Sequence, residues 1–326
     1  MKLEHGGDWA GFQIEYGAAP LDFSANVSPL GPPEGVVRAV EAAVGQLGRY
    51  PDPLCRGLRR VLGERLGTPE DWILCGNGAA DLIWRLAETL RPRRAVVPIP
   101  AFSEYQAALG RFGCAVTEYP TDPAEDFRLG RGILEAITPE VDLLLLCQPG
   151  NPAGRTVEPA LLGEILDRCA ACGVQLAVDE CFLDFLDEPE RYTLLGALEG
   201  NRLVLFRAFT KFYGMAGLRL GYCLSAQEEL LERMRLGGQP WAVSAPAQEA
   251  GVAALRDRTY EQTLRRLIQT QRPLLAAGLT AVGCRVVPGE ANFLRFFHPD
   301  SVLDEKLRRR GVLIRPCRNY RGLGEG

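Results

Sequence analysis

Apolar and polar positions alternate along the chain in two patterns, one typical of helices and one of buried strands. Apolar residues three or four positions apart predict helices over 33–47, 55–67, 79–91, 103–113 and 159–173. Short apolar runs between them predict strands over 71–76, 94–100, 114–120, 142–148, 174–180, 201–209 and 218–224. The segment "FRAFTKFYGMAGLRLGY" at 206–222 fits neither pattern cleanly, and Lys211 and Arg219 within it lie on no amphipathic face.

The alternation of helices and strands predicts an α/β domain with a mainly parallel sheet flanked by helices, over about 36–236. The near-continuous apolar run at 142–148 is typical of a strand covered on both faces. After 236 the pattern predicts a smaller α+β domain, 237–326, and we expect residues 1–35 to form an arm that joins it. The helices of this domain are expected over 244–279 and 302–311, and its strands over 284–289, 291–298 and 312–317.

Length, charge and hydropathy exclude several classes of protein. With 326 residues and 47% hydrophobic composition, the chain is long enough for about two domains. The net charge of −4 and the absence of a long basic patch argue against a nucleic-acid partner. No apolar run approaches the roughly 20 residues that span a bilayer, and residues 1–11 lack the apolar core of a signal peptide. We therefore expect a cytoplasmic protein without a membrane partner.

Most of the ten cysteines lie inside apolar runs, where cysteine behaves as a small core residue. Cys169 and Cys172 form one CxxC pair near the end of a predicted helix; a redox or zinc role remains an alternative to packing there. His5 and His298 are the two histidines of the sequence, and no HExxH motif is present, so we expect no metal site.

Four features lie at predicted strand ends, where parallel sheets bind ligands. A strand ends at Gly76-Asn77-Gly78 and a helix begins near Ala79 and Ala80, so free N–H groups there could bind an anion. An ordinary strand–helix turn is the alternative. Asn151, held between Gly150 and Pro152, could donate to a ligand oxygen or simply occupy a turn.

Charged residues make up the other two features. Asp179 ends an apolar strand and could cap a helix or pair with a buried cation. Lys211 in an apolar pocket could attack a carbonyl to form a Schiff base, and the fork of Arg219 suits two phosphate oxygens; each could also be a solvated surface cation. Together these features match what pyridoxal 5'-phosphate requires: a phosphate cradle, a carboxylate for the ring nitrogen, an amide for the ring hydroxyl and a lysine for the aldehyde.

The sequence resembles the fold-type I pyridoxal-phosphate enzymes, the aspartate aminotransferase superfamily (class I/II), and within it the L-threonine-O-3-phosphate decarboxylases of cobalamin synthesis. Asn-Pro-x-Gly, the strand-end Asp179, Lys211 and Arg219 match in order. Segments that carry the decarboxylase likeness lie along the whole chain, at 5–8, 21–33, 49–53, 101–105, 179–185, 209–222, 240–245 and 313–323.

The resemblance implies further roles. Phe102 would stack on the cofactor ring, Thr210 would help to hold its phosphate, and Tyr50 would reach the cofactor phosphate of a partner subunit, so a homodimer with shared sites is implied. The positions that match substrate contacts of the decarboxylases are His5, Gly6, Asn26, Asn151 and Arg315. A surface position for Arg315 and a disordered tail for His5 are the alternatives.

Histidinol-phosphate aminotransferases are the nearest competing group. They usually carry a tyrosine three residues after the cofactor aspartate, where this sequence has Phe182. Phe182, the "HGG" at 5–7 and the segment 313–323 favour a decarboxylase that converts threonine phosphate to aminopropanol phosphate. Serine phosphate remains an alternative substrate, because a pocket discriminates one methyl group by only about 1–3 kcal/mol.

Two departures from the family pattern raise a third interpretation. Ala208 replaces the usual serine or threonine three residues before the lysine, which removes one phosphate hydrogen bond worth roughly 1 kcal/mol or more. The family continues past "RGLGEG" with a strand that carries a carboxylate-binding arginine, so we expect the small domain to lack its last segment. A truncated or degenerate cofactor-binding homologue with little activity is therefore the third alternative.

Overall fold

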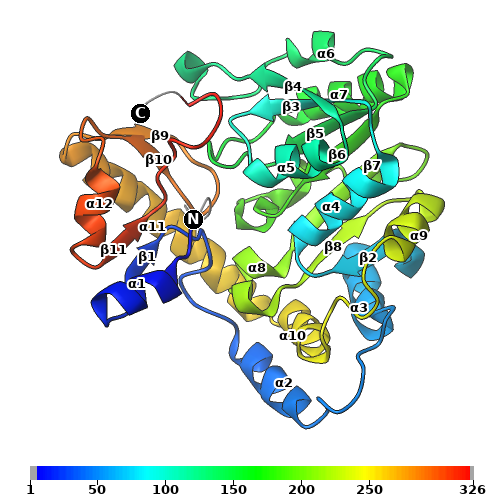
Figure 1. The fold of residues 1–326 in the computed structure, drawn as a ribbon, viewed down its shortest axis with the longest axis horizontal. Coiled ribbons are helices and arrows are strands. Elements are labelled where there is room, and N and C mark those ends of the chain that lie inside the picture. Colours follow the sequence, from blue (N-terminus) through cyan, green and yellow to red (C-terminus); the bar gives the residue numbers. More distant parts are fainter. Residues whose placement is uncertain (1–5, 324–326) are drawn as a thin grey trace.

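The structure, a computed structural model, describes residues 6–323. Its centre is a seven-stranded sheet (Figure 1). In spatial order the strands are β2 (Ile73–Gly76), β8 (Gly221–Leu224), β7 (Leu203–Ala208), β6 (Gln175–Asp179), β5 (Leu143–Cys147), β3 (Arg94–Ile99) and β4 (Ala115–Pro120). β8 runs antiparallel to both neighbours, and the other pairs are parallel, so the predicted α/β fold with a mainly parallel sheet is confirmed.

Helices cover both faces of this sheet, as the strand composition requires. Leu144 and Leu146 of β5 pack into one apolar cluster, with side chains of α3 (Arg56–Leu66), α7 (Pro159–Cys172), α10 (Ala245–Arg256) and α11 (Arg258–Ala281). Leu143 and Leu145 point the other way, into a second cluster with α4 (Ala79–Leu90), α5 (Ser103–Arg111) and α9 (Glu228–Leu236). Because both faces are buried, every position of β5 has to be apolar.

A smaller unit lies beside the sheet and contains both ends of the described chain. The N-terminal strand β1 (Leu21–Phe23) pairs in parallel with β11 (Val312–Ile314), and β9 (Arg285–Val287) pairs antiparallel with β10 (Arg295–Phe297). Figure 1 shows β1 and β11, the blue and red ends of the chain, side by side with α1 (Trp9–Tyr16) and α12 (Leu303–Arg308). The remaining α-helices are α2 (Glu34–Val44), α6 (Ile133–Ala136) and the short α8 (Phe209–Phe212).

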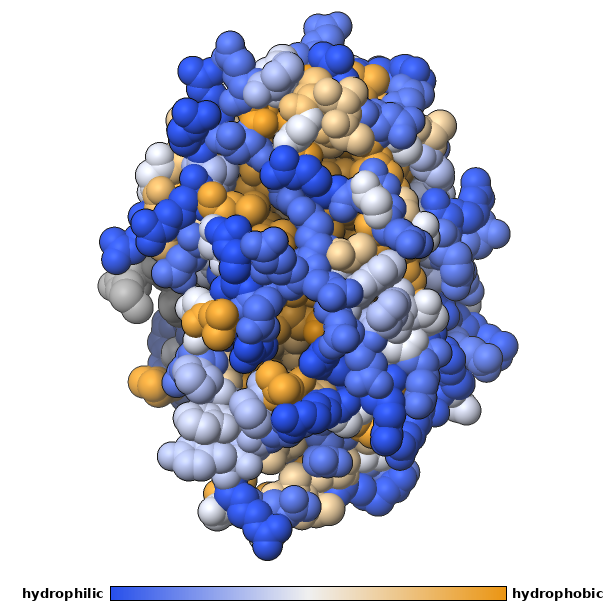
Figure 2. Space-filling model, turned by 90° about the vertical axis from the view of Figure 1, so that its right-hand side faces the viewer, coloured by the Kyte–Doolittle hydropathy of each residue, from blue (hydrophilic) through white to orange (hydrophobic). Residues whose placement is uncertain are grey.

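The molecular surface in Figure 2 is mostly hydrophilic, with apolar groups between the charged side chains. Within residues 6–323, no helix combines the length and apolar character needed to cross a bilayer. The same residues contain no group of three or more His, Cys, Asp or Glu side chains arranged to hold a metal ion.

Candidate active site

Lys211 lies on α8, directly after β7, with its amine turned to the N-terminal segment. Its Nζ donates to the carbonyl of Ala25 at 2.9 Å and lies 5.8 Å from the centre of the Phe182 ring. Burial lowers the pKa of Lys211, and the charge of Arg219 lowers it further, against the opposing effect of Cys181. A larger share of the amine is therefore neutral at a given pH, which is the form that attacks a carbonyl.

Asp179 ends β6 and is held on both of its oxygens. Only 5% of the residue is exposed; Tyr105 donates its hydroxyl to Oδ2 at 2.5 Å, and the N–H of Cys181 donates to Oδ1 at 3.0 Å. Burial and the charge of Asp179 raise the pKa of Tyr105 well above its ordinary value, so the phenol stays protonated and donates. The fixed carboxylate is suited to hold a proton on a ligand nitrogen.

Tyr105 also connects the carboxylate to Phe102. The two rings meet edge to face, 5.6 Å between centres. Phe102 precedes α5, and Tyr105 lies in the first turn of that helix, so one helix start positions both side chains.

The start of α4 and the guanidinium of Arg219 lie against each other. Gly78, with φ of 84°, precedes α4, and a Cβ there would lie 2.7 Å from Nη2 of Arg219. A Cβ on Gly221 would lie 2.5 Å from the backbone nitrogen of Ala79. Both glycines are needed for this close approach. The first N–H groups of the helix, including those of Ala79 and Ala80, have no acceptor within the helix, so the place suits an anion.

The loop after β5 carries Asn151 to the same edge of the sheet. The N–H of Gly150 donates to the carbonyl of Arg155 at 2.8 Å, and that of Gly154 donates to Gly150 at 2.6 Å. These bonds fix the turn around Asn151, which is half-buried. The strand before this loop, β5, ends beside the end of β6, because Cys147 pairs in register with Asp179.

Residues 24–28 cross over Lys211 and place Asn26. The N–H of Ser28 donates to the carbonyl of Lys211 at 2.9 Å, and Nδ2 of Asn292 donates to the carbonyl of Asn26 at 3.0 Å. Gly6 packs on the same segment: a Cβ there would lie 2.0 Å from the carbonyl oxygen of Ser24. The predicted contact residue His5 lies outside the described residues.

The other predicted residues divide into two groups. Phe182 is 4% exposed and meets Phe293 edge to face, and Thr210 is 7% exposed on α8. Tyr50 and Arg315 form the second group. Tyr50 is 80% exposed, and Arg315 donates to the carbonyl of Pro316 at 3.1 Å and lies 5.1 Å from the centre of the Tyr320 ring.

Three residues of this site escaped the sequence analysis: Tyr105, Ala25 and Asn292. Tyr105 had a local signal, because it follows Phe102 by three positions on a predicted helix. The other two had none. Ala25 acts through its backbone carbonyl, and Asn292 is 266 positions from the residue it holds.

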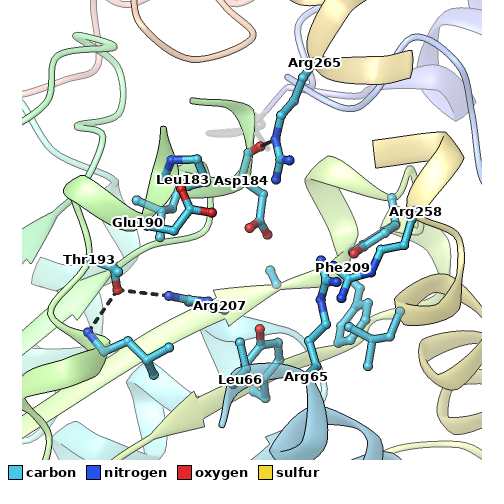
Figure 3. Close-up of a pocket in the computed structure, with 16 residues that line it drawn as sticks. Arg65, Leu66, Leu183, Asp184, Glu190, Thr193, Arg207, Phe209, Arg258 and Arg265 are labelled. Atoms are coloured by element: carbon cyan, nitrogen blue, oxygen red, sulfur yellow. Dashed lines mark hydrogen bonds between the residues drawn. The ribbon is translucent and has the colours of Figure 1, made fainter. Parts of the chain in front are cut away.

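A cavity of about 250 Å³ lies apart from these residues, between α3, α11 and β7 (Figure 3). Four arginines line it, and acidic partners compensate two of them, Arg65 and Arg207. Arg65 pairs with Glu261 at 2.7 Å and Arg207 with Glu180 at 2.8 Å, and Arg207 also donates to Thr193. We therefore do not take this cavity as the substrate site.

A sequence model of the aminotransferase class I and II family matches residues 19–322. The chain belongs to this family. This aminotransferase-family chain is 38% identical to the threonine-phosphate decarboxylase of Salmonella typhimurium, over 98% of the chain and 89% of that protein.

Solved structures of two kinds of enzyme share the fold of this family member. The histidinol-phosphate aminotransferase of Clostridium acetobutylicum superposes with a TM-score of 0.86 at 26% identity, over 93% of this chain and 91% of that one. The L-threonine-O-3-phosphate decarboxylase of Porphyromonas gingivalis superposes with a TM-score of 0.80 at 25% identity, over the same shares.

Proposed function

We propose that this chain decarboxylates L-threonine O-3-phosphate to (R)-1-amino-2-propanol phosphate, with pyridoxal 5'-phosphate as cofactor, in cobalamin synthesis. The observation that carries the proposal is the 38% identity to a threonine-phosphate decarboxylase over 98% of the chain. The enzyme is then a carboxy-lyase on an aminotransferase fold, and its small-molecule partner is a phosphorylated amino acid.

The residues present fit the cofactor. The guanidinium of Arg219 lies against Gly78 at the start of α4, an approach that a Cβ there would prevent, and a guanidinium beside the first N–H groups of a helix suits a phosphate group. Thr210 and the N–H groups of Ala79 and Ala80 add donors to this place. Asp179 would face the ring nitrogen, Asn151 the ring hydroxyl, and Phe102 and Phe182 would border the ring.

When bound, pyridoxal phosphate would supply an aldehyde that bonds an amine and a ring that draws electrons away from the substrate Cα. Asp179, which Tyr105 and Cys181 fix, would keep the ring nitrogen protonated. Asn26, Asn151 and Arg315, with Gly6 and His5 at the N-terminal arm, would hold the substrate so that its Cα–carboxylate bond is the one aligned for cleavage. Contacts to the remote phosphate supply binding energy for this alignment. Nζ of Lys211 would return a proton to Cα after carbon dioxide leaves.

A histidinol-phosphate aminotransferase activity is the second candidate. The observation in its favour is the structural similarity to such an enzyme, with a TM-score of 0.86. The buried Phe182 argues against it, because a phenyl ring has no hydroxyl to bond the ring oxygen of the cofactor.

An assay that follows both products separates the candidates. With cofactor and threonine phosphate, we expect carbon dioxide in an amount equal to the aminopropanol phosphate formed, and no glutamate from histidinol phosphate and 2-oxoglutarate. Glutamate formation without carbon dioxide would contradict the decarboxylase and support the aminotransferase. A protein that binds the cofactor covalently but turns over neither substrate would support the third interpretation, a degenerate homologue.

We further propose a cytoplasmic homodimer in which Tyr50 reaches the cofactor phosphate of the second subunit. Tyr50 stacks on Trp241 with 4.5 Å between ring centres, and the two side chains are 80% and 45% exposed. Val44 and Leu47, a few residues before Tyr50 in the chain, add exposed apolar surface at 56% and 63%. A second copy of the chain would bury it.

Subunit mixing tests the shared site. Tyr50→Ala is expected to weaken cofactor binding about tenfold, the effect of losing one hydrogen bond to a charged group. In a mixed dimer, the Lys211→Met subunit supplies an intact Tyr50 to the site of the Tyr50→Ala subunit. Tight cofactor binding at that site should therefore return in a titration. If mixing restores nothing, Tyr50 does not act across a dimer interface.

A further inference from the structure

Arg295, at the start of β10, is a buried guanidinium that has no carboxylate partner in the part of the chain that the structure describes. The residue is 5% exposed and lies between two aromatic rings, 4.1 Å from the centre of Phe127 and 4.4 Å from that of Phe297. Its Nη1 is buried and has no hydrogen-bond partner among the described residues. Within residues 6–323, no carboxylate lies at ion-pair distance from it.

Burying an unpaired charge lowers the stability of the folded protein, and an anionic ligand that pairs with the guanidinium would offset this cost. Burial lowers the pKa of Arg295 to about 10, which still leaves the guanidinium charged at neutral pH. The two rings offset part of the cost of burying the charge, but they leave Nη1 without a hydrogen-bond acceptor. Buried polar groups in folded proteins are almost always paired, so an unpaired one calls for an explanation in terms of function.

The position of Arg295 connects it to the candidate active site. Asn292 and Phe293, just before β10, contact Asn26 and Phe182. Cys317, two residues after Arg315, and Tyr320 pack in the same apolar cluster as Phe127 and Phe297, the two rings that enclose Arg295. The guanidinium of Arg315 lies 5.1 Å from the centre of the Tyr320 ring, so both guanidinium groups border this cluster.

We propose that Arg295 binds the phosphate group of the substrate together with Arg315. The proposal rests on the function proposed above and names the part of the substrate that this region recognises. A phosphate monoester carries close to two negative charges at neutral pH, and guanidinium forks match its oxygens. The phosphate of the cofactor has its own place at Gly78 and Arg219, so the two anions do not compete.

Arg285 offers a matched control. It lies 3.9 Å from the centre of the same Phe297 ring, but its side chain is 54% exposed. Arg295→Met is expected to raise KM for threonine phosphate about 10- to 100-fold, the effect of losing a charge-assisted pair of hydrogen bonds, with a smaller change in kcat. Arg285→Met should leave KM unchanged. Equal KM values in both variants and the wild type would overturn the proposal.

Stability distinguishes binding from a structural role. Because Arg295→Met removes a buried unpaired charge, we expect the free energy of unfolding in urea to stay the same or rise. A variant that loses stability while its KM for threonine phosphate is unchanged would show that Arg295 serves packing alone.

A binding measurement keeps the test independent of turnover. When the cofactor is bound, its phosphate would occupy the site at Gly78 and Arg219. Calorimetric titration of the loaded protein with inorganic phosphate therefore reports a second anion site. Wild type and Arg285→Met should bind phosphate equally, and Arg295→Met should bind it at least tenfold more weakly. Phosphate binding that is the same in all three proteins would overturn the proposal. If the wild type forms glutamate instead of carbon dioxide, the proposed decarboxylation fails, but this titration still decides the role of Arg295.

Discussion

Replacing Lys211 by methionine should abolish covalent attachment of the cofactor and lower turnover by roughly 10⁴-fold or more, because in the proposed mechanism its amine serves as both nucleophile and proton donor. The measurement is the mass of the intact protein after borohydride reduction in the presence of pyridoxal phosphate. Wild type should gain the mass of one reduced cofactor, and Lys211→Met should gain none.

The sequence provides a control, since it contains three lysines: Lys2, Lys211 and Lys306. Lys306 is 59% exposed and pairs with Asp300 at 2.6 Å, so Lys306→Met should retain both cofactor and turnover. Reduced cofactor on the Lys211→Met protein would assign the covalent link to another residue and reject the proposed site.

The buried amine of Lys211 also predicts that stability depends on pH, and Lys211→Met is the reference protein that tests it. Burial lowers the pKa of Lys211 in the folded protein, so the unfolded chain binds that proton more tightly. The wild type without cofactor should therefore gain stability relative to Lys211→Met as pH rises from the lowered pKa towards the ordinary value of 10.5. Urea unfolding of both proteins at several pH values measures this difference, and a difference that does not change with pH would contradict the buried amine.

Replacing Asp179 by asparagine should lower turnover about 10²- to 10⁴-fold, because an amide cannot hold a proton on the ring nitrogen as a carboxylate does. The Cα bond would then break without the full electron withdrawal of a protonated ring. The rate of carbon dioxide release at saturating cofactor measures this effect. Asp187→Asn is the control, since Asp187 lies on the surface and bonds Gln269.

Tyr105→Phe should have a smaller effect of the same kind. The carboxylate keeps its charge and the bond from Cys181, but it loses the 2.5 Å bond from the phenol. Cofactor affinity should fall about tenfold, as for one hydrogen bond to a charged group. A Tyr105→Phe protein with unchanged affinity would show that Cys181 alone suffices to fix Asp179.

Much of this arrangement could be predicted from the sequence, because parallel strands bring their carboxyl ends to one edge of a sheet. The apolar runs identified β2, β5, β6 and β7. Gly78, Asn151, Asp179 and Lys211 lie at the carboxyl ends of these strands or within a few residues of them. The start of α4 at Ala79 was predicted from the glycines before it and is confirmed.

The contacts between these groups could not be predicted, because they depend on packing between distant segments. Asn292 bonds a backbone carbonyl near the N-terminus, and nothing in its own neighbourhood indicates this. β1 was overlooked because three residues, two of them with exposed side chains, give no periodic signal. The domain boundaries and the roles of Tyr50 and Arg315 remain predictions.

The pairing of β1 with β11 has a consequence for synthesis of the protein. The segment that crosses Lys211 follows β1 directly, but the partner of β1 is made almost 300 residues later. The strands of the sheet and the lysine could assemble while the ribosome is still extending the chain, whereas Asn26 and Arg315 could take their places only near the end of translation. A nascent chain would thus form the sheet that carries Lys211 first, and the segments that we propose to contact the substrate last.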